Sequence, residues 1–318
     1  MSPLKQKLFD ERSVPAGVIQ YPGMTSKTEK AIFYNLARHH YRGEGQIVDV
    51  GVFLGASTNA FASGLRQNPK ALGKIPPGTK PIRSFDTAIW VKAFDRYLKH
   101  DILAKAVGPE ASLKEGDSFF PVLNKLLAEH LDLIDFRIGD IVETARAEGP
   151  IEIAFYDCLK NRKRDWAAFC GFTPSFIPGH TIVIQQDYFY WSAYDNKIRQ
   201  EYLAPYFEFI AAAGPSAVFR LTKPIPDEFY CKDPIVGLTL AEKLAFLRRA
   251  AERAGSAKHR AFTEMSSVAL LLASKETARA RAHLQEIASR YADLEVSVPR
   301  FGVEIERLRQ KAILQEEL

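Results

Sequence analysis

The sequence predicts an α/β fold in which helices cover both faces of a mostly parallel β-sheet, followed by an all-helical C-terminal region. Short runs of β-branched and apolar residues alternate with helical patterns at least five times before residue 222, which is typical of a parallel sheet. A glycine turn follows the first of these runs. From Leu238 onward the chain is rich in Ala, Arg, Glu and Leu at helical spacing.

The composition is that of an ordinary globular protein. The chain has 318 residues, enough for one large domain with an appendage, and a formal net charge of +5 that is spread along it. This distribution does not favour nucleic acid as a partner. Cys158, Cys170 and Cys231 form no C-x-x-C pair, and no signal peptide or membrane span is recognisable. We therefore expect reduced thiols, a cytoplasmic location and no membrane partner.

Three regions are predicted. Residues 1–27, which contain several Pro and Gly, form an extended arm. Residues 28–236 form the α/β domain, and its first helix spans Thr28 to Tyr41. Residues 237–318 form the helical region, whose expected role is packing or formation of a homodimer.

The central motif is a strand, a tight turn and a helix between Gln46 and Leu65. The run Ile47–Val50 meets a glycine turn from Gly51 to Gly55, and a helix with Ala, Ser and Thr follows. Ligands of open α/β sheets bind at such helix starts. A dinucleotide or phosphate loop would need glycines where Phe53 and Ala56 stand, or a following Gly-Lys-Ser/Thr. The turn suits a nucleoside with an amino-acid tail, although a purely structural turn would have the same glycines.

Further carboxylates follow the next strands. Asp86 ends the strand beginning at Pro81, Asp140 follows the strand from Leu133 to Ile138, and Asp157 ends the strand beginning at Ile151. An acid at the place of Asp86 can accept hydrogen bonds from ribose hydroxyls. Each of these acids could equally be a solvated carboxylate in a turn.

The remaining segments complete the predicted domain. Helices are expected at Trp90 to Val107, at Ser118 to His130 and from Trp166 to Phe176. A buried strand, residues 181–184, leads from His180 into Gln186 and Asp187. Tyr188 to Tyr206 is dense in aromatic residues, which either pack under the sheet or line an acceptor pocket. A helix is predicted over Phe207 to Ala217 and an edge strand over Ala217 to Leu221.

Together, D-x-G-x-x-x-G-x-S-T, S-F-D, I-G-D, F-Y-D and P-G-H-T-I-V-I-Q-Q-D-Y resemble the ordered motifs of class I S-adenosylmethionine-dependent methyltransferases. The chain looks most like the macrocin O-methyltransferase family over about Thr28 to Tyr190. The resemblance implies a Rossmann-like methyltransferase fold and S-adenosylmethionine as cofactor. It implies a set of cofactor-binding residues, with Asp86 on the ribose and Asp140 on the adenine: Asp49, Gly51, Gly55, Ser57, Thr58, Asp86 and Asp140.

The resemblance also implies a Mg²⁺ ion on Asp157, Gln186 and Asp187, where Gln186 replaces a carboxylate of the family pattern. A neutral amide weakens the attraction for a cation. Asp157 and Asp187 are the expected catalytic residues, either through Mg²⁺, which we favour, or as a general base. His180 replaces a family glycine. It could be a base, but the start of a buried strand favours a structural histidine.

The predicted function is O-methylation of a hydroxyl group of a small molecule or sugar, which would be the acceptor substrate. One alternative is a non-catalytic α/β module with a vestigial cofactor site and a helical tail that binds a protein partner. The departure at Gln186 and the long tail motivate this alternative. An NAD-linked oxidoreductase is disfavoured by Phe53.

Overall fold

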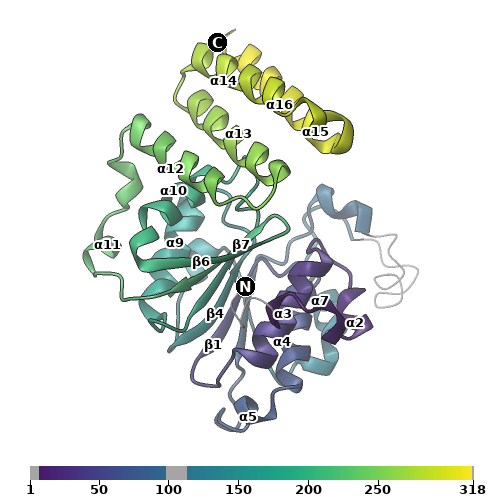
Figure 1. The fold of residues 1–318 in the computed structure, drawn as a ribbon. Helices are drawn as coiled ribbons and strands as arrows, with labels where there is room; N and C mark the ends of the chain where they lie inside the picture. The colour runs from purple at the N-terminus through teal and green to yellow at the C-terminus, as the bar shows by residue number, and fades with distance from the viewer. Residues whose placement is uncertain (1–6, 98–112, 317–318) are drawn as a thin grey trace. The chain divides into compact units, whose positions relative to one another are not determined.

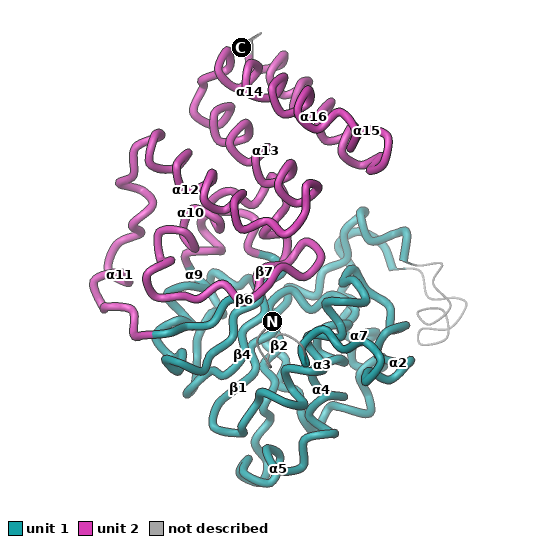
Figure 2. Tube along the Cα trace, in the orientation of Figure 1, with its two compact units in different colours: residues 1–158, 167–184, 219–222 teal, residues 159–166, 185–218, 223–318 magenta. Residues whose placement is uncertain are grey.

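The computed structural model describes residues 7–97 and 113–316. The chain divides into two compact units (Figure 2). Unit 1 consists of Met1–Cys158, Ala167–Ile184 and Phe219–Thr222. Unit 2 consists of Leu159–Trp166, Gln185–Val218 and Lys223–Leu318.

The sheet has seven strands in the order β3-β2-β1-β4-β5-β7-β6. The strands are β1 (Gln46–Val50), β2 (Ile82–Asp86), β3 (Ile134–Ile138), β4 (Ile151–Tyr156), β5 (Ile182–Gln185), β6 (Phe207–Ala213) and β7 (Ser216–Leu221). β1 pairs in parallel with both β2 and β4, and β2 pairs in parallel with β3. The strand order reverses between β1 and β4, the place where open α/β sheets bind their ligands.

The predicted helix over Phe207 to Ala217 is wrong, because this segment forms β6 and the start of β7. The alanines at residues 211–213 favour a helix locally. The alternation of burial along β6, in which Ala211 and Ala213 are buried and their neighbours less so, has the period of a strand. Gly214, with φ +57°, and Pro215 then close a two-residue connection between β6 and β7. Two-residue connections join antiparallel strands, so this edge departs from the parallel sheet.

Two helices of unit 1 lie side by side against the sheet: α3 (Lys27–His39) and α4 (Ala56–Arg66) (Figure 1). Ser26 and Glu29 form a capping box at the start of α3, which satisfies two N–H groups of the first turn. The rings of Phe61 in α4 and Phe155 in β4 lie 5.0 and 4.4 Å from that of Phe33 in α3, measured between centroids. These contacts fix the start of α4 relative to the sheet.

The other elements of unit 1 are short. They are η1 (Glu11–Ser13), α2 (Ala16–Ile19), α5 (Pro69–Leu72), η2 (Lys92–Tyr97), α7 (Phe120–Leu126), η3 (Ala128–His130), α8 (Ile141–Thr144) and η4 (Thr173–Ser175). The N-terminal arm is therefore not extended throughout, because η1 and α2 interrupt it and contact α3. The helix predicted for Trp90 to Val107 is a short 3₁₀ segment at Lys92–Tyr97, and its part beyond residue 97 lies outside the described residues. α9 (Arg162–Phe172) contributes residues to both units.

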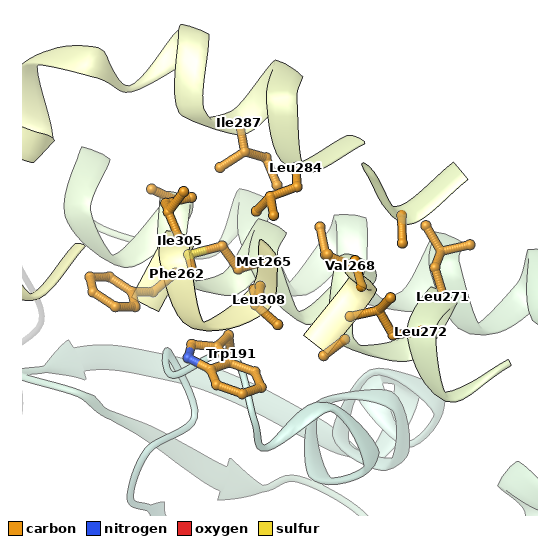
Figure 3. Packing of buried hydrophobic residues seen from close by; sticks show 14 of the residues in the cluster. Trp191, Phe262, Met265, Val268, Leu271, Leu272, Leu284, Ile287, Ile305 and Leu308 are labelled. Carbon is orange, nitrogen blue, oxygen red and sulfur yellow. The ribbon is translucent and has the colours of Figure 1, made fainter. Parts of the chain in front are cut away.

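The helical C-terminal region of the prediction is confirmed. Unit 2 contains α10 (Tyr194–Tyr202), η5 (Ala204–Tyr206), α11 (Glu228–Cys231), η6 (Pro234–Val236), α12 (Leu240–Glu252), α13 (Ala257–Ala273), α14 (Thr277–Arg290), α15 (Ala292–Ser297) and α16 (Pro299–Glu316). Phe262 and Met265 of α13 pack with Leu284 of α14 and Leu308 of α16, and Trp191 joins the same cluster (Figure 3). No helix within residues 7–97 and 113–316 combines the length and apolar character that crossing a bilayer requires.

The aromatic segment after β5 serves mainly as an anchor within unit 2. The Tyr190 hydroxyl donates to Glu304 Oε1 at 2.6 Å, and the Trp191 indole N–H donates to Glu304 Oε2 at 3.0 Å. The Tyr188 hydroxyl donates to Glu201 at 2.8 Å. Of the two interpretations of this segment, packing therefore accounts for these three side chains.

Candidate functional site

The carboxyl ends of four neighbouring strands of unit 1 are held at one edge by main-chain hydrogen bonds beyond the strands. The bonds run from Gly51 N to Phe85 O at 2.9 Å, from Gly139 N to Asp86 O at 2.9 Å, and from Asp157 N to Val50 O at 2.8 Å. The glycine turn, Asp86, Asp140 and Asp157 are thus brought to the same edge. These residues were predicted from separate segments of the sequence, and parallel strands explain why they meet.

The turn after β1 requires glycine at two positions. Gly51 has φ +89°, and a Cβ added to it would lie 3.1 Å from Asp157 Cβ. Gly55 has φ +88°, and its added Cβ would lie 2.8 Å from Leu127 Cδ1. Both residues therefore need the left-handed conformation and the absence of a side chain. The result is a main-chain turn that a ligand can approach closely, followed directly by α4.

The buried carboxylate of Asp49 stabilises the start of the helix that follows this turn. Asp49 is fully buried and accepts hydrogen bonds from Ser57 Oγ at 2.9 Å and Thr58 Oγ1 at 2.6 Å. Burial, opposed by these two hydroxyls, raises the pKa of Asp49 to about 7. The hydroxyls of Ser57 and Thr58 are thus directed to Asp49. What these residues offer to a ligand is their main-chain N–H groups, which have no carbonyl partner within the first turn of a helix.

Asp86 connects the glycine turn to the end of β2. Its two carboxylate oxygens accept hydrogen bonds from the N–H groups of Phe53 and Ala88, each at 2.8 Å. Both donors have positive φ, +48° and +53°, so the loops bend sharply around this carboxylate. Burial raises the pKa of Asp86, and the N–H groups oppose the shift. The Val52 N–H and the Thr87 hydroxyl also act to lower its pKa, so four neutral donors surround the carboxylate at the end of β2.

An aromatic cluster beside the turn was not predicted as part of the site. The Phe53 ring lies 4.2 Å from Phe94, 5.2 Å from Tyr97, 5.8 Å from Phe119 and 6.0 Å from Trp90, measured between centroids. In the sequence, Phe94 and Tyr97 fall within the helix predicted for Trp90 to Val107. The available signal was the density of large rings directly after the strand that ends in Asp86.

Asp140 caps a short helix, and its hydrogen bond to adenine stays a prediction. Its Oδ1 accepts a hydrogen bond from Val142 N at 3.0 Å and caps α8. The preceding Gly139 has φ +151°, and an added Cβ would lie 2.9 Å from Thr144 Cγ2. The partly exposed Asp140 therefore has a fixed main-chain position at the edge.

The predicted catalytic and metal residues are divided between the units: Asp157 belongs to unit 1, and Gln186 and Asp187 belong to unit 2. Asp187 has φ +55°, and its Oδ2 lies 2.8 Å from the ammonium nitrogen of Lys160. Gln186 is almost fully buried.

The surroundings of Asp187 do not fit Mg²⁺. The Lys160 ammonium already supplies the positive charge that a metal would bring to this carboxylate. A second amine, on the fully buried Lys197, donates to Ala193 O at 3.1 Å; burial lowers its pKa to about 7, and the charge of Asp187 opposes that shift. No group of three or more His, Cys, Asp and Glu side chains within the described ranges is arranged to hold a metal ion.

His180 is structural. Its Nε2 lies 2.7 Å from Glu152 Oε2, and its ring stacks on that of His40 with centroids 4.3 Å apart. Both His180 and Glu152 are buried, and Glu152 lies near the start of β4, whereas Asp157 follows its end. His180 is thus on the edge of the sheet opposite the glycine turn.

No protein-family model matches the chain, and no curated protein matches it. Among solved structures, the chain is similar to the O-methyltransferase NovP, with 17% identity, a TM-score of 0.46, and coverage of 69% of this chain and 88% of NovP. It is also similar to the calicheamicin methyltransferase CalS11, with 19% identity, a TM-score of 0.44, and coverage of 69% and 93%. The pyocyanin biosynthetic protein PhzM has 11% identity, a TM-score of 0.37, and coverage of 62% and 56%. At identities this low, the similarity does not establish a function, which has to be argued from the geometry of the site.

Proposed function

We propose that this protein is an S-adenosylmethionine-dependent methyltransferase. The observation that supports it most is the joining of the glycine turn to Asp86, since the Phe53 N–H is bonded to the carboxylate that ends the next strand, the place where an acid can accept ribose hydroxyls. The same bond disfavours a dinucleotide, because this N–H group is committed and Phe53 occupies a glycine position of the fingerprint.

In this proposal, different residues at the edge bind different parts of the cofactor. The main-chain N–H groups at the start of α4, beside Gly51 and Gly55, would bind the carboxylate of the methionine tail. Asp86 would accept the ribose hydroxyls, and Asp140 would accept the adenine amino group. Asp49 would position Ser57 and Thr58, whose hydroxyls donate hydrogen bonds to its carboxylate.

The acceptor in this proposal is a hydroxyl group of a small molecule or sugar. Bound S-adenosylmethionine would supply a methyl group already activated by a positively charged sulfur. The protein then has to orient the acceptor oxygen and accept its proton. Asp157 is suited to this because its Cβ lies against the glycine turn of the same unit. Since the surroundings of Asp187 do not fit Mg²⁺, no step in this scheme uses a metal ion.

Calorimetry with S-adenosylhomocysteine tests the cofactor. We expect the wild type to bind it, and Asp86→Ala to weaken binding by about 1–3 kcal/mol because bonded groups lose their partner. Glu115→Ala, at an exposed position of unit 1, is the control and should bind like the wild type. Absence of binding by the wild type would refute the proposal.

A further inference from the structure

One pocket of unit 1 has a strongly basic lining. Its volume is about 390 Å³, and it lies at the C-terminal end of α3 and beside α5. Among its lining residues, six are basic and none is acidic: Arg38, His39, His40, Arg42, Lys70 and Lys74. The volume falls in the range of small-molecule sites, about 300–1,000 Å³.

The positive charge of this pocket is only partly compensated. Lys74 pairs with Glu44 at 3.6 Å. Within residues 7–97 and 113–316, no carboxylate oxygen lies within 4.0 Å of the charged nitrogens of Arg38, Arg42 or Lys70. Cations near the end of α3 are favoured by the helix dipole, which accounts for Arg38. It does not account for Lys70, which α5 brings to the same pocket.

The two histidines contribute little to the positive charge of the pocket, which comes from its arginines and lysines. Burial, reinforced by the neighbouring His180, lowers the pKa of His40 to about 4, and burial with the charge of Arg38 lowers the pKa of His39. The His40 ring is therefore neutral at pH 7, and the His39 ring is shifted toward its neutral form. They contribute polar ring atoms to the lining without adding to the repulsion among the four permanent cations.

Partly buried hydrogen bonds hold the wall of the pocket in place. The carboxylate of Glu152 accepts hydrogen bonds from the N–H groups of Arg42 at 2.7 Å and Gly45 at 2.9 Å. The Asn68 side chain donates to Tyr41 O at 2.9 Å, which joins the segment before α5 to the end of α3. The cations therefore extend from a fixed main chain, and a ligand need not order the loop on binding.

We propose that this pocket binds a small, multiply charged oxyanion such as the phosphate or pyrophosphate group of a soluble compound. Guanidinium and ammonium groups are the protein's strongest partners for phosphate oxygens, and an anion would relieve the repulsion among the clustered cations. Glu152, beneath the pocket, lies near the start of β4, so the pocket is on the edge opposite the glycine turn. The site is separate from the proposed cofactor site and does not depend on it.

Calorimetry of the full chain with inorganic pyrophosphate at low ionic strength tests the proposal. The double variant Arg42→Gln/Lys70→Gln removes two exposed cations of the pocket. We expect it to weaken binding by at least about tenfold, the effect of losing charge-assisted hydrogen bonds. Lys92→Gln/Lys114→Gln changes the net charge of unit 1 by the same amount at exposed positions outside the pocket and should leave the affinity within about twofold.

Three results would overturn the proposal. They are no pyrophosphate binding by the wild type, equal weakening in both double variants, and binding to phosphatidylglycerol vesicles in place of pyrophosphate. The single variant Lys74→Gln should also weaken binding, which guards against a folding defect in the double variant. Thermal unfolding should be unchanged in all of these proteins, and S-adenosylhomocysteine binding should be retained, which separates this test from that of the proposed function.

Discussion

Buried carboxylates are held in different ways in the two units. In unit 1, the carboxylate of Asp49 accepts bonds from two hydroxyl groups, and that of Asp86 accepts bonds from two main-chain N–H groups. In unit 2, the carboxylate of Asp165 lies 2.6 Å from Arg199 Nε, and that of Glu201 lies 2.6 Å from Arg253 Nε. Neutral donors surround the first pair, and an arginine accompanies each member of the second.

The difference separates a ligand site from structural anchors. An arginine bound to a buried carboxylate uses its acceptor capacity and fixes two elements to each other, as Arg199 does between α9 and α10. A buried carboxylate bound only by neutral donors is costly, because no opposite charge compensates it. Burial raises the pKa of Asp49 and Asp86, and it also raises that of Asp165 despite Arg199, so the two kinds of carboxylate differ in their partners and not in the direction of the pKa shift. Buried carboxylates without a cation are typical of functional sites, which supports the assignment of the ligand to the edge of unit 1.

Breaking an arginine anchor of unit 2 should have the largest effect. Arg199 is buried and contacts both Asp165 and Asp233, the latter at 2.9 Å. Arg199→Met leaves the buried carboxylate of Asp165 without its cation and Asp233 with only Arg162, at 3.9 Å, and should lower the free energy of unfolding by about 3–5 kcal/mol. Urea denaturation followed by circular dichroism measures this change. Arg309→Met removes an exposed pair with Glu306 at 3.6 Å and should change stability by less than about 1 kcal/mol. Equal losses in the two variants would contradict the comparison.

Gly51→Ala should reveal the ligand-binding role of the turn in unit 1. Strain in the left-handed region costs about 1–2 kcal/mol for a residue with a Cβ. The new methyl group also lies 3.1 Å from Asp157 Cβ, so the turn must shift. We expect loss of at least about tenfold in S-adenosylhomocysteine affinity, or about 1.4 kcal/mol, by calorimetry.

Gly78→Ala is the matched control for backbone strain. Gly78 has φ +80°, and no atom lies within 4 Å of its added Cβ. This variant should lose similar stability, about 1–2 kcal/mol, and keep its affinity for the ligand. If both variants lost affinity equally, the glycine turn would have no specific role.

The parts of the fold with a clear period were predictable from the sequence. The run Ile47–Val50 between glycines predicted β1, and the helical spacing after Leu238 predicted the C-terminal helices, both of which the structure has. The segment Phe207–Ala213 was not predictable in this way, because its alanines favour a helix locally while pairing with β7 decides the outcome.

From the sequence, the candidate site was predictable only as a set of residues at the ends of strands. The parallel order of the strands brings Asp86 next to the glycine turn, because the carboxyl ends of parallel strands lie at the same edge of the sheet. Sequence could not show that Ser57 and Thr58 direct their hydroxyls to Asp49, because rotamers depend on the packed neighbours. Nor could it show that Lys160 approaches Asp187, since that contact depends on tertiary structure.

The last prediction concerns the pH dependence of stability that Asp49 contributes. Its pKa is about 7 in the folded protein, above its value of about 3.9 in an unfolded chain, so the folded state binds more protons between these values. Stability from this group is therefore fully present below pH 4 and is lost as pH rises toward 7, with a slope of the order of 1 kcal/mol per pH unit. Asp49→Asn cannot titrate and should lack this loss, so the wild type minus variant difference in unfolding free energy should fall from pH 4 to pH 7. Urea denaturation at intervals across that range measures the difference. A difference that is flat or rises with pH would show that the hydroxyls of Ser57 and Thr58 keep Asp49 ionised, and the contrast with the arginine-bound carboxylates of unit 2 would then be one of geometry rather than of charge.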